Sequence, residues 1–195
     1  MSPTLPRLQM PDFAPELAQY LAPRVKRLGY LGELFQVAGH APQVLLGFMQ
    51  FTDALKAALP DNLAETAVLT TATLMQNAYE RNQHERLCVR TGLSRDWIRD
   101  VERLEPDAPS LLSDDERAVQ RYAIAAVETR GLQAQAAFED VTRRLPAQEA
   151  VAIAMLIGRY ITHAIMVNTL RLPPPVPSIW EDGFGADTPA HSPSL

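Results

Sequence analysis

One segment constrains the fold of this chain more than any other, namely residues 61–93, which read DNLAETAVLTTATLMQNAYERNQHERLCVRTGL. The segment begins as an apolar run and turns polar at Gln76. Glu80, His84 and Cys88 then follow at spacings of four residues, so they share one face of a helix. No other stretch places a carboxylate, an imidazole and a thiol together. Any chemistry of this protein is therefore expected here.

The remaining apolar residues recur mainly at helical spacing, as in the stripe between His40 and Pro60. No segment alternates with period two over enough residues to predict a strand. The sequence therefore predicts an all-α fold, a compact bundle of about six to eight helices. Within it, one unbroken central helix is expected from Asp61 to about Thr91, where Gly92 supplies a stop.

Composition narrows the classes of partner and compartment. The net charge of −5 argues against a nucleic-acid surface, which needs clustered Lys and Arg. The single cysteine cannot form an internal disulfide, which is typical of a reducing, cytoplasmic environment. The proline-containing start has no apolar stretch typical of a signal peptide. Arg159 and His163 interrupt the most apolar stretch, residues 150–170, so a buried helix is expected there rather than a membrane span.

Several short motifs, in order along the chain, resemble those of one superfamily. Tyr79-Glu80 followed by His84 matches a YE-x3-H signature, and it is flanked by AGHAP at 38–42, GLS at 92–94, SDDERA at 113–118 and IGRY at 157–160. On these motifs the chain resembles the carboxymuconolactone decarboxylase and alkylhydroperoxidase-D-like (AhpD-like) superfamily. The resemblance covers residues 28–172. It implies a decarboxylase-like helical domain there, after an N-terminal arm with a short helix (1–27) and before a proline-rich tail (173–195).

The resemblance includes a peroxidase style, whose members carry Glu-x11-Cys-x2-Cys-x3-His. Projected onto this chain, these positions fall on Glu65, Asn77, Glu80 and His84, so both thiols are missing. A dithiol peroxidase needs a nucleophilic thiolate and a resolving thiol. Cys88 lies outside the motif and has no second cysteine to pair with. Alkylhydroperoxidase-like antioxidant activity is therefore the disfavoured alternative, and Cys88 is expected to be a buried small residue.

The other style resembles the lactone decarboxylases and implies a lyase that works without a metal or an organic cofactor. Loss of CO2 from an unsaturated lactone acid requires charge delocalised into the ring and a proton delivered to carbon. Glu80 and His84 would share this acid/base work, and Tyr79 would donate a hydrogen bond. Arg81 would bind a substrate carboxylate if it faces the pocket, and Asn77 is a further substrate-binding candidate.

Glu65 is a conditional member of this site. On an unbroken helix it lies about 22 Å from Glu80, at ~1.5 Å per residue. It can join the site only if the helix breaks near Gln76-Asn77 or if another subunit supplies the counterpart. Otherwise Glu65 is a structural residue.

A non-catalytic reading stays open, because a Glu–His pair at this spacing is often only a surface ion pair. The chain would then be an oligomeric binding protein. The expected partners are a small-molecule substrate and further copies of the chain, as a dimer, trimer or hexamer. His163, Tyr160 and Asn168 are further candidates for the lining of the pocket. Trp180 and Phe184 are expected to anchor the tail.

Overall fold

The computed structural model describes residues 5–181, and Phe184 therefore lies outside the described residues. Within this range the chain forms nine α-helices and one 3-10 helix, and no strand. The elements are η1 (Met10–Asp12), α1 (Pro15–Leu28), α2 (Glu33–Ala38), α3 (Pro42–Ala57), α4 (Asp61–Leu74), α5 (Ala78–Arg90), α6 (Arg95–Glu102), α7 (Asp114–Glu128), α8 (Gln135–Arg144) and α9 (Ala147–Leu170). The predicted all-α class is confirmed.

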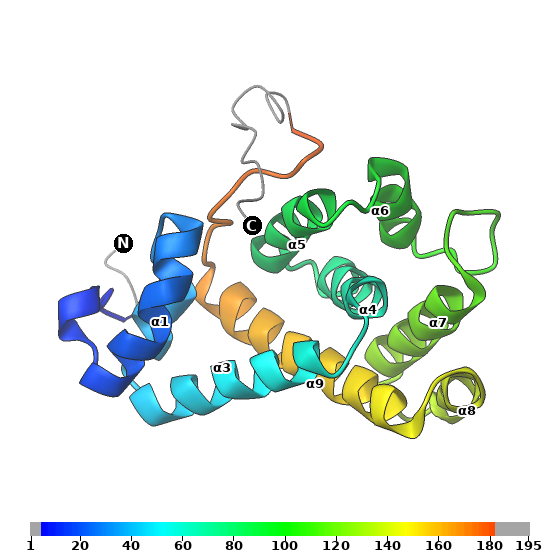
Figure 1. Cartoon of the computed structure of the whole chain (residues 1–195), viewed down its shortest axis with the longest axis horizontal. Helices are drawn as coiled ribbons and strands as arrows, with labels where there is room; N and C mark the ends of the chain where they lie inside the picture. Colours follow the sequence, from blue (N-terminus) through cyan, green and yellow to red (C-terminus); the bar gives the residue numbers. More distant parts are fainter. Residues whose placement is uncertain (1–4, 182–195) are drawn as a thin grey trace, which may run out of the picture.

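Helix α4 lies at the centre of the bundle and is viewed end-on in Figure 1, with α5, α6, α7 and α9 around it. All of its side chains from Leu63 to Ala72 are buried, and many are Ala or Thr. Small side chains let the neighbouring helices approach closely from several sides at once. The main core consists of apolar residues of α3, α4, α7, α8 and α9, with α4 packed against α7 and α9. Helix α1 packs against the N-terminal half of α3 in a separate apolar cluster.

The expectation of one central helix is wrong, because that segment is two helices. Helix α4 ends at Leu74, and Gln76 adopts a left-handed backbone conformation with φ of 52°. Asn77 then caps α5, since its side-chain oxygen accepts a hydrogen bond from the Glu80 amide at 3.3 Å. The break turns α5 back against α4. It also explains why the helix count exceeds the expected range by one.

The C-terminal strap, which we define as residues 173–181, runs along the outside of α5 and α6 (Figure 1). Glu85 on α5 accepts from both the Ser178 hydroxyl and the Ile179 amide, at 2.5 and 2.8 Å. The Trp180 indole donates to Glu102 on α6 at 2.8 Å. Ile179 is 1% exposed within an apolar cluster formed with α4, α5 and α6. The strap is thus a packed part of the structure, and Trp180 anchors it to the body as expected.

Helix α9 has the length and hydropathy of a membrane span. In the bundle it packs against α3, α4, α7 and α8. Arg159 and His163, which interrupt its apolar sequence, are both buried. Inside the bundle the two polar side chains meet partners from α3 and α5, which explains why an apolar helix carries them.

Candidate active site

The break between α4 and α5 brings Glu65 to His84. Their side chains meet with His84 Nδ1 2.5 Å from Glu65 Oε2, and both are buried. Because a carboxylate only accepts hydrogen bonds, Nδ1 carries the proton in this pair. Glu65 could join the site only through a helix break or through a second subunit, and the helix break brings it there within one chain.

The other ring nitrogen of His84 faces different groups. Nε2 lies 2.9 Å from the Tyr160 hydroxyl and 3.4 Å from Glu80 Oε2. Burial disfavours the imidazolium, but the charge and hydrogen bond of Glu65 outweigh burial and raise the pKa of His84 above its usual range. Burial likewise opposes ionisation of Glu65, but His84 and Lys56 lower the pKa of Glu65 below its ordinary value. Each member of the pair therefore favours the charged form of the other, which is an imidazolium held by a carboxylate.

Glu80 bridges His84 to a second histidine. Its Oε1 lies 2.7 Å from His163 Nε2 and 3.6 Å from Arg159 Nη1. Burial would raise the pKa of Glu80, but His163, His84 and Arg159 together hold it well below its usual range. The Asn77 amide nitrogen lies 3.3 Å from His163 Nδ1 and donates to it, which leaves the proton of His163 on Nε2 toward Glu80.

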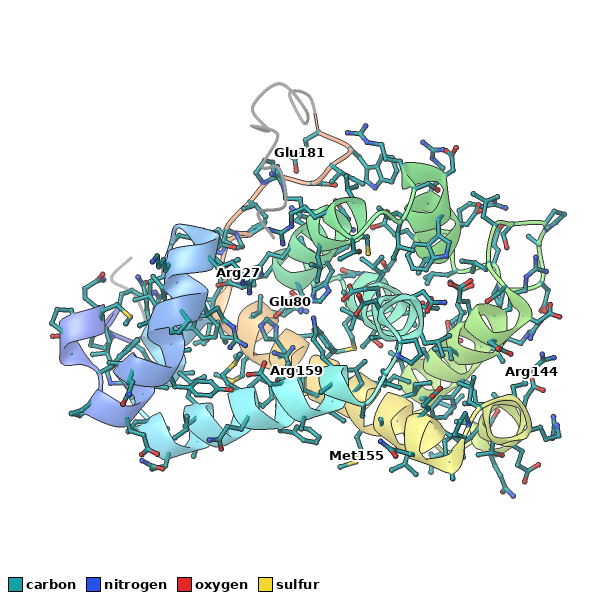
Figure 2. The ribbon with its side chains drawn as sticks, in the orientation of Figure 1. Arg27, Glu80, Arg144, Met155, Arg159 and Glu181 are labelled. Carbon is teal, nitrogen blue, oxygen red and sulfur yellow. The ribbon has the colours of Figure 1, made fainter. Side chains whose placement is uncertain are left out.

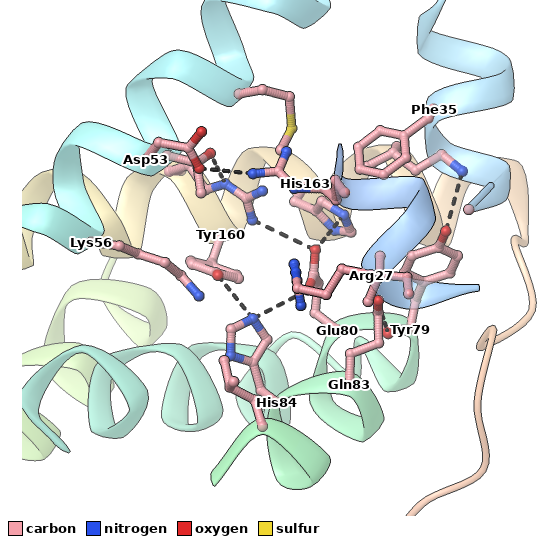
Figure 3. A pocket seen from close by; sticks show the side chains of 18 of the residues that line it. Arg27, Phe35, Asp53, Lys56, Tyr79, Glu80, Gln83, His84, Tyr160 and His163 are labelled. Carbon is pink, nitrogen blue, oxygen red and sulfur yellow. Dashed lines mark hydrogen bonds and ion pairs between the residues drawn. The ribbon is translucent and has the colours of Figure 1, made fainter. Parts of the chain in front are cut away.

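These groups form one wall of a cavity of about 240 Å³, which is shown in Figure 3. This volume lies below the roughly 300–1,000 Å³ of pockets that take drug-sized ligands, so the cavity suits a small metabolite. Its lining cations outnumber its carboxylates and predict an anionic ligand. The cations are Arg24, Arg27, Lys56, Arg90 and Arg159, and the carboxylates are Asp53 and Glu80.

Three of the six residues expected at the site from the sequence line the cavity: Tyr79, Glu80 and His84. The Tyr79 hydroxyl accepts from the Leu34 amide at 3.3 Å, and burial raises its pKa. It fits beside Gly32, where an added Cβ would lie 2.5 Å from the hydroxyl oxygen. Tyr79 therefore depends on a glycine at the start of α2.

The other three expected residues do not line this cavity. Glu65 and Asn77 stand behind it, where they bind His84 and His163 respectively. Glu65 also borders a second, smaller cavity of about 150 Å³ that shares Lys56 with the first. The Arg81 guanidinium is turned away and pairs with Glu85 at 3.2 Å, on the side of α5 that faces the strap. The condition for a carboxylate-binding role of Arg81 is thus not met.

Lys56 and Arg159 are among the lining residues that the sequence did not point to. Arg159 could have been suspected, since a charge within an apolar helix needs a buried partner. Lys56 carries no such signal, because it stands at the end of an ordinary amphipathic helix. Of the α9 residues suspected from sequence, Tyr160 and His163 line the cavity, whereas Asn168 donates to the Met75 carbonyl at the end of α4.

Cys88 is fully buried, as the sequence predicted. Its sulfur lies 3.8 Å from Glu65 Oε2 and donates to it. Burial and the neighbouring carboxylate both raise the pKa of the thiol far above its usual range. A thiolate nucleophile is therefore disfavoured here. Within residues 5–181, no cluster of three or more His, Cys, Asp or Glu side chains is arranged to hold a metal ion.

No known family profile and no curated protein matches this sequence, but solved structures match its fold. An uncharacterised peroxidase-related protein from Ralstonia eutropha JMP134, with an alkylhydroperoxidase AhpD core, superposes with a TM-score of 0.75, 18% identity and 92% coverage of each chain. This chain has the AhpD core fold. The fold implied by the sequence resemblance is thereby confirmed.

Two further structures share this AhpD core. A protein of unknown function from Agrobacterium tumefaciens, provisionally named as the antioxidant defence protein AhpD, matches with a TM-score of 0.65 and 21% identity over 72% of this chain and 96% of its own. The debrominase Bmp8, as a Cys→Ala variant bound to 2,3,4-tribromopyrrole, matches with a TM-score of 0.75 and 18% identity over 89% of this chain and 92% of its own. At such identities the AhpD core carries no particular reaction with it.

Proposed function

We propose that this protein is a cofactor-free acid/base enzyme, a decarboxylase-like lyase that acts on a small carboxylated, lactone-type metabolite. One observation carries the proposal. His84 is bound at Nδ1 by Glu65, while its Nε2 meets Tyr160 and Glu80 at the wall of a small, cation-lined cavity. This arrangement orients an imidazolium and aims its second N–H toward the cavity.

The proposed reaction needs no oxidant or reductant. The bond from the ring carbon to the leaving carboxylate breaks, and its electron pair moves into the conjugated lactone carbonyl, whose oxygen becomes negatively charged. The His84 imidazolium then delivers its Nε2 proton to carbon as this charge returns. His84 is left neutral and regains a proton from solvent. The raised pKa of His84 suits this role, because the residue starts as a proton donor.

Supporting residues divide the remaining work. Glu65 acts as a positioning residue that fixes the tautomer and the orientation of His84. Glu80, held ionised between two histidines, stabilises the charged imidazole from the cavity side. The alternative antioxidant activity finds no support in the site, because Cys88 is inaccessible and bound to Glu65. No particular observation favours a second function.

Self-association is a further part of this proposal. The outward face of α9 carries the exposed side chains Val151, Met155 and Ile165, between 48% and 56% exposed, and α3 adds Val44 at 72%. Between Glu149 and Arg171 that outer face holds no charged residue, since Arg159 is buried. An uncharged apolar stripe of this length supports a homo-oligomer that covers it.

Turnover of a panel of small lactone acids, followed by CO2 release and ring absorbance, tests the function. We expect His84→Gln to lower kcat by about 10²–10⁴-fold, the usual contribution of a general acid. The matched control is His40→Gln, because His40 is exposed and its ring nitrogen bonds to the Pro6 carbonyl in the arm, away from the cavity. Full activity in His84→Gln, or an equal loss in both variants, would rule out His84 as the proton donor.

A further inference from the structure

Arg159 is a buried cation with hydrogen-bonding capacity left over. Its side chain is 4% exposed and lines the cavity from α9. Nε donates to the Thr52 hydroxyl on α3 at 2.8 Å. Nη1 is buried and makes no hydrogen bond in the structure, because its nearest carboxylate oxygen, on Glu80, lies 3.6 Å away. An unsatisfied N–H of a buried charged group is costly, so it calls for an explanation.

The orientation of this guanidinium is fixed by aromatic rings. Its central carbon lies 4.2 Å from the centre of the Tyr160 ring and 4.7 Å from that of Phe48. The hydroxyl of the same Tyr160 meets His84 Nε2. The unpaired N–H therefore belongs to a group that is one aromatic ring away from the proposed proton donor. Figure 2 places Arg159 beside Glu80 inside the bundle.

Lys56 brings a second cation to the same cavity. Its ammonium lies 3.6 Å from Glu65 Oε1, which is an ion pair beyond hydrogen-bond distance, and its side chain is 33% exposed. Burial opposes its charge, but Tyr160, Glu65 and Glu80 together raise the pKa of Lys56, which keeps it an ammonium. In Figure 3 the Lys56 side chain extends toward Tyr160 and His84.

We infer that Arg159 Nη1 and the Lys56 ammonium form an oxyanion receptor, which binds the substrate oxygen on which negative charge develops. The ligand class is an enolate-like or phenolate-like oxygen anion. The inference deepens the proposed function and rests on it. A receptor that fixes its donors before the charge appears stabilises the transition state without reorganising. The exposed Arg27 and Arg90 at the rim are the competing positions for an anion, and the test separates them.

Binding of 4-nitrophenol to the wild-type protein tests the receptor without any turnover. The phenol and the phenolate absorb at different wavelengths, so the pKa of the bound molecule can be read from a spectrum. Cations at the oxygen lower that pKa. We expect a lowering of at least about one unit in the wild type, that is, at least tenfold tighter binding of the phenolate. In Arg159→Gln we expect this shift to shrink, because only the Lys56 ammonium then remains at the oxygen.

Arg90→Gln is the matched control, and it should keep the full shift. A shift that survives Arg159→Gln but is lost in Arg90→Gln would overturn the inference, as would the absence of any shift in the wild type. If Arg159→Gln fails to fold, two other measurements provide the same test. Lys56→Met should reduce the shift, and nitrophenolate should move the NMR signal of the Arg159 Nε–H in the wild type. A shifted phenol pKa without turnover of any lactone acid would reject the proposed function and keep the receptor.

Discussion

The carboxylate of Glu65 binds His84 across a helix break, with 2.5 Å between Oε2 and Nδ1, although the two residues are nineteen positions apart in the chain. Each side chain holds the other in its charged form, despite burial that disfavours both charges. The pair therefore depends on its mutual interaction, and removing one partner should change the titration of the other.

The first prediction concerns Glu65→Gln. Loss of the carboxylate removes the interaction that raises the pKa of His84 and leaves burial, which lowers it. We expect the His84 imidazole to titrate at lower pH in the variant, by NMR, and the high-pH limb of the activity profile to move in the same direction. Glu16→Gln, on the exposed surface of α1, is the control. An unchanged His84 titration would contradict the assigned pairing.

The same pair makes the free energy of unfolding depend on pH in both the acidic and the basic range. Glu65 has a lowered pKa, so its contribution is present above its unfolded value near 4.5 and is lost as pH falls through the folded pKa. His84 has a raised pKa, so its contribution is complete below about 6.5 and is lost as pH rises through the folded pKa. Urea unfolding from pH 3 to 9 should show both losses, and Glu65→Gln should remove them.

Asn77→Ala should cost more than an ordinary helix cap. Asn77 caps α5 and also donates to the buried His163 ring, so the variant loses both interactions. We expect a loss of roughly 2–4 kcal/mol in urea unfolding, as a cap contributes about 1 and an unpaired buried polar atom costs about 1–3. Ser94→Ala removes only the cap of α6, which accepts from the Trp97 amide, and should lose about 1 kcal/mol. Equal losses would show that the His163 contact adds nothing.

Docking of the strap should weaken as pH rises. Burial raises the pKa of Glu102 to about 7 against the Trp180 hydrogen bond, and Glu85 adds to the increase. A raised carboxyl pKa means that the folded state favours the proton, so docking is tightest below about 4.5 and weakens as pH rises toward 7. Trp180 fluorescence should follow this transition. The transition should vanish in Glu102→Gln, and a pH-independent signal in the wild type would contradict it.

The apolar stripe on α9 predicts the effect of a surface charge. Met155→Glu places a carboxylate in the middle of the stripe, and we expect light scattering to show a smaller assembly than for the wild type. Gln148→Glu adds the same charge at an exposed position near the start of α9 and should leave the mass unchanged. A wild-type protein that is monomeric at all concentrations would reject self-association.

Sequence spacing located Tyr79, Glu80 and His84, because residues on one helix keep their relations wherever the helix is placed. The helix break was missed, since LMQNA contains neither Gly nor Pro and the left-handed position falls on Gln76. Which side of α5 faces the cavity depends on how α1, α3 and α9 pack around it, and the local sequence does not contain this information. Arg81 was therefore expected at the cavity, whereas it lies outside it and pairs with Glu85. Lys56 reaches the site only through the packing of α3 and has no local signal.

The position of α9 in the chain has a consequence for assembly of the site. The Glu65–His84 contact closes within the central segment, whereas Tyr160, Arg159 and His163 follow more than seventy residues later. Until α9 docks, Glu80 has His84 on its own helix beside it but lacks the His163 imidazole and the Arg159 guanidinium. During synthesis, which runs from the N-terminus, the helices that precede α9 therefore carry a carboxylate whose charge is only partly compensated. Docking of α9 supplies the remaining partners of that charge and completes the cavity wall in the same step.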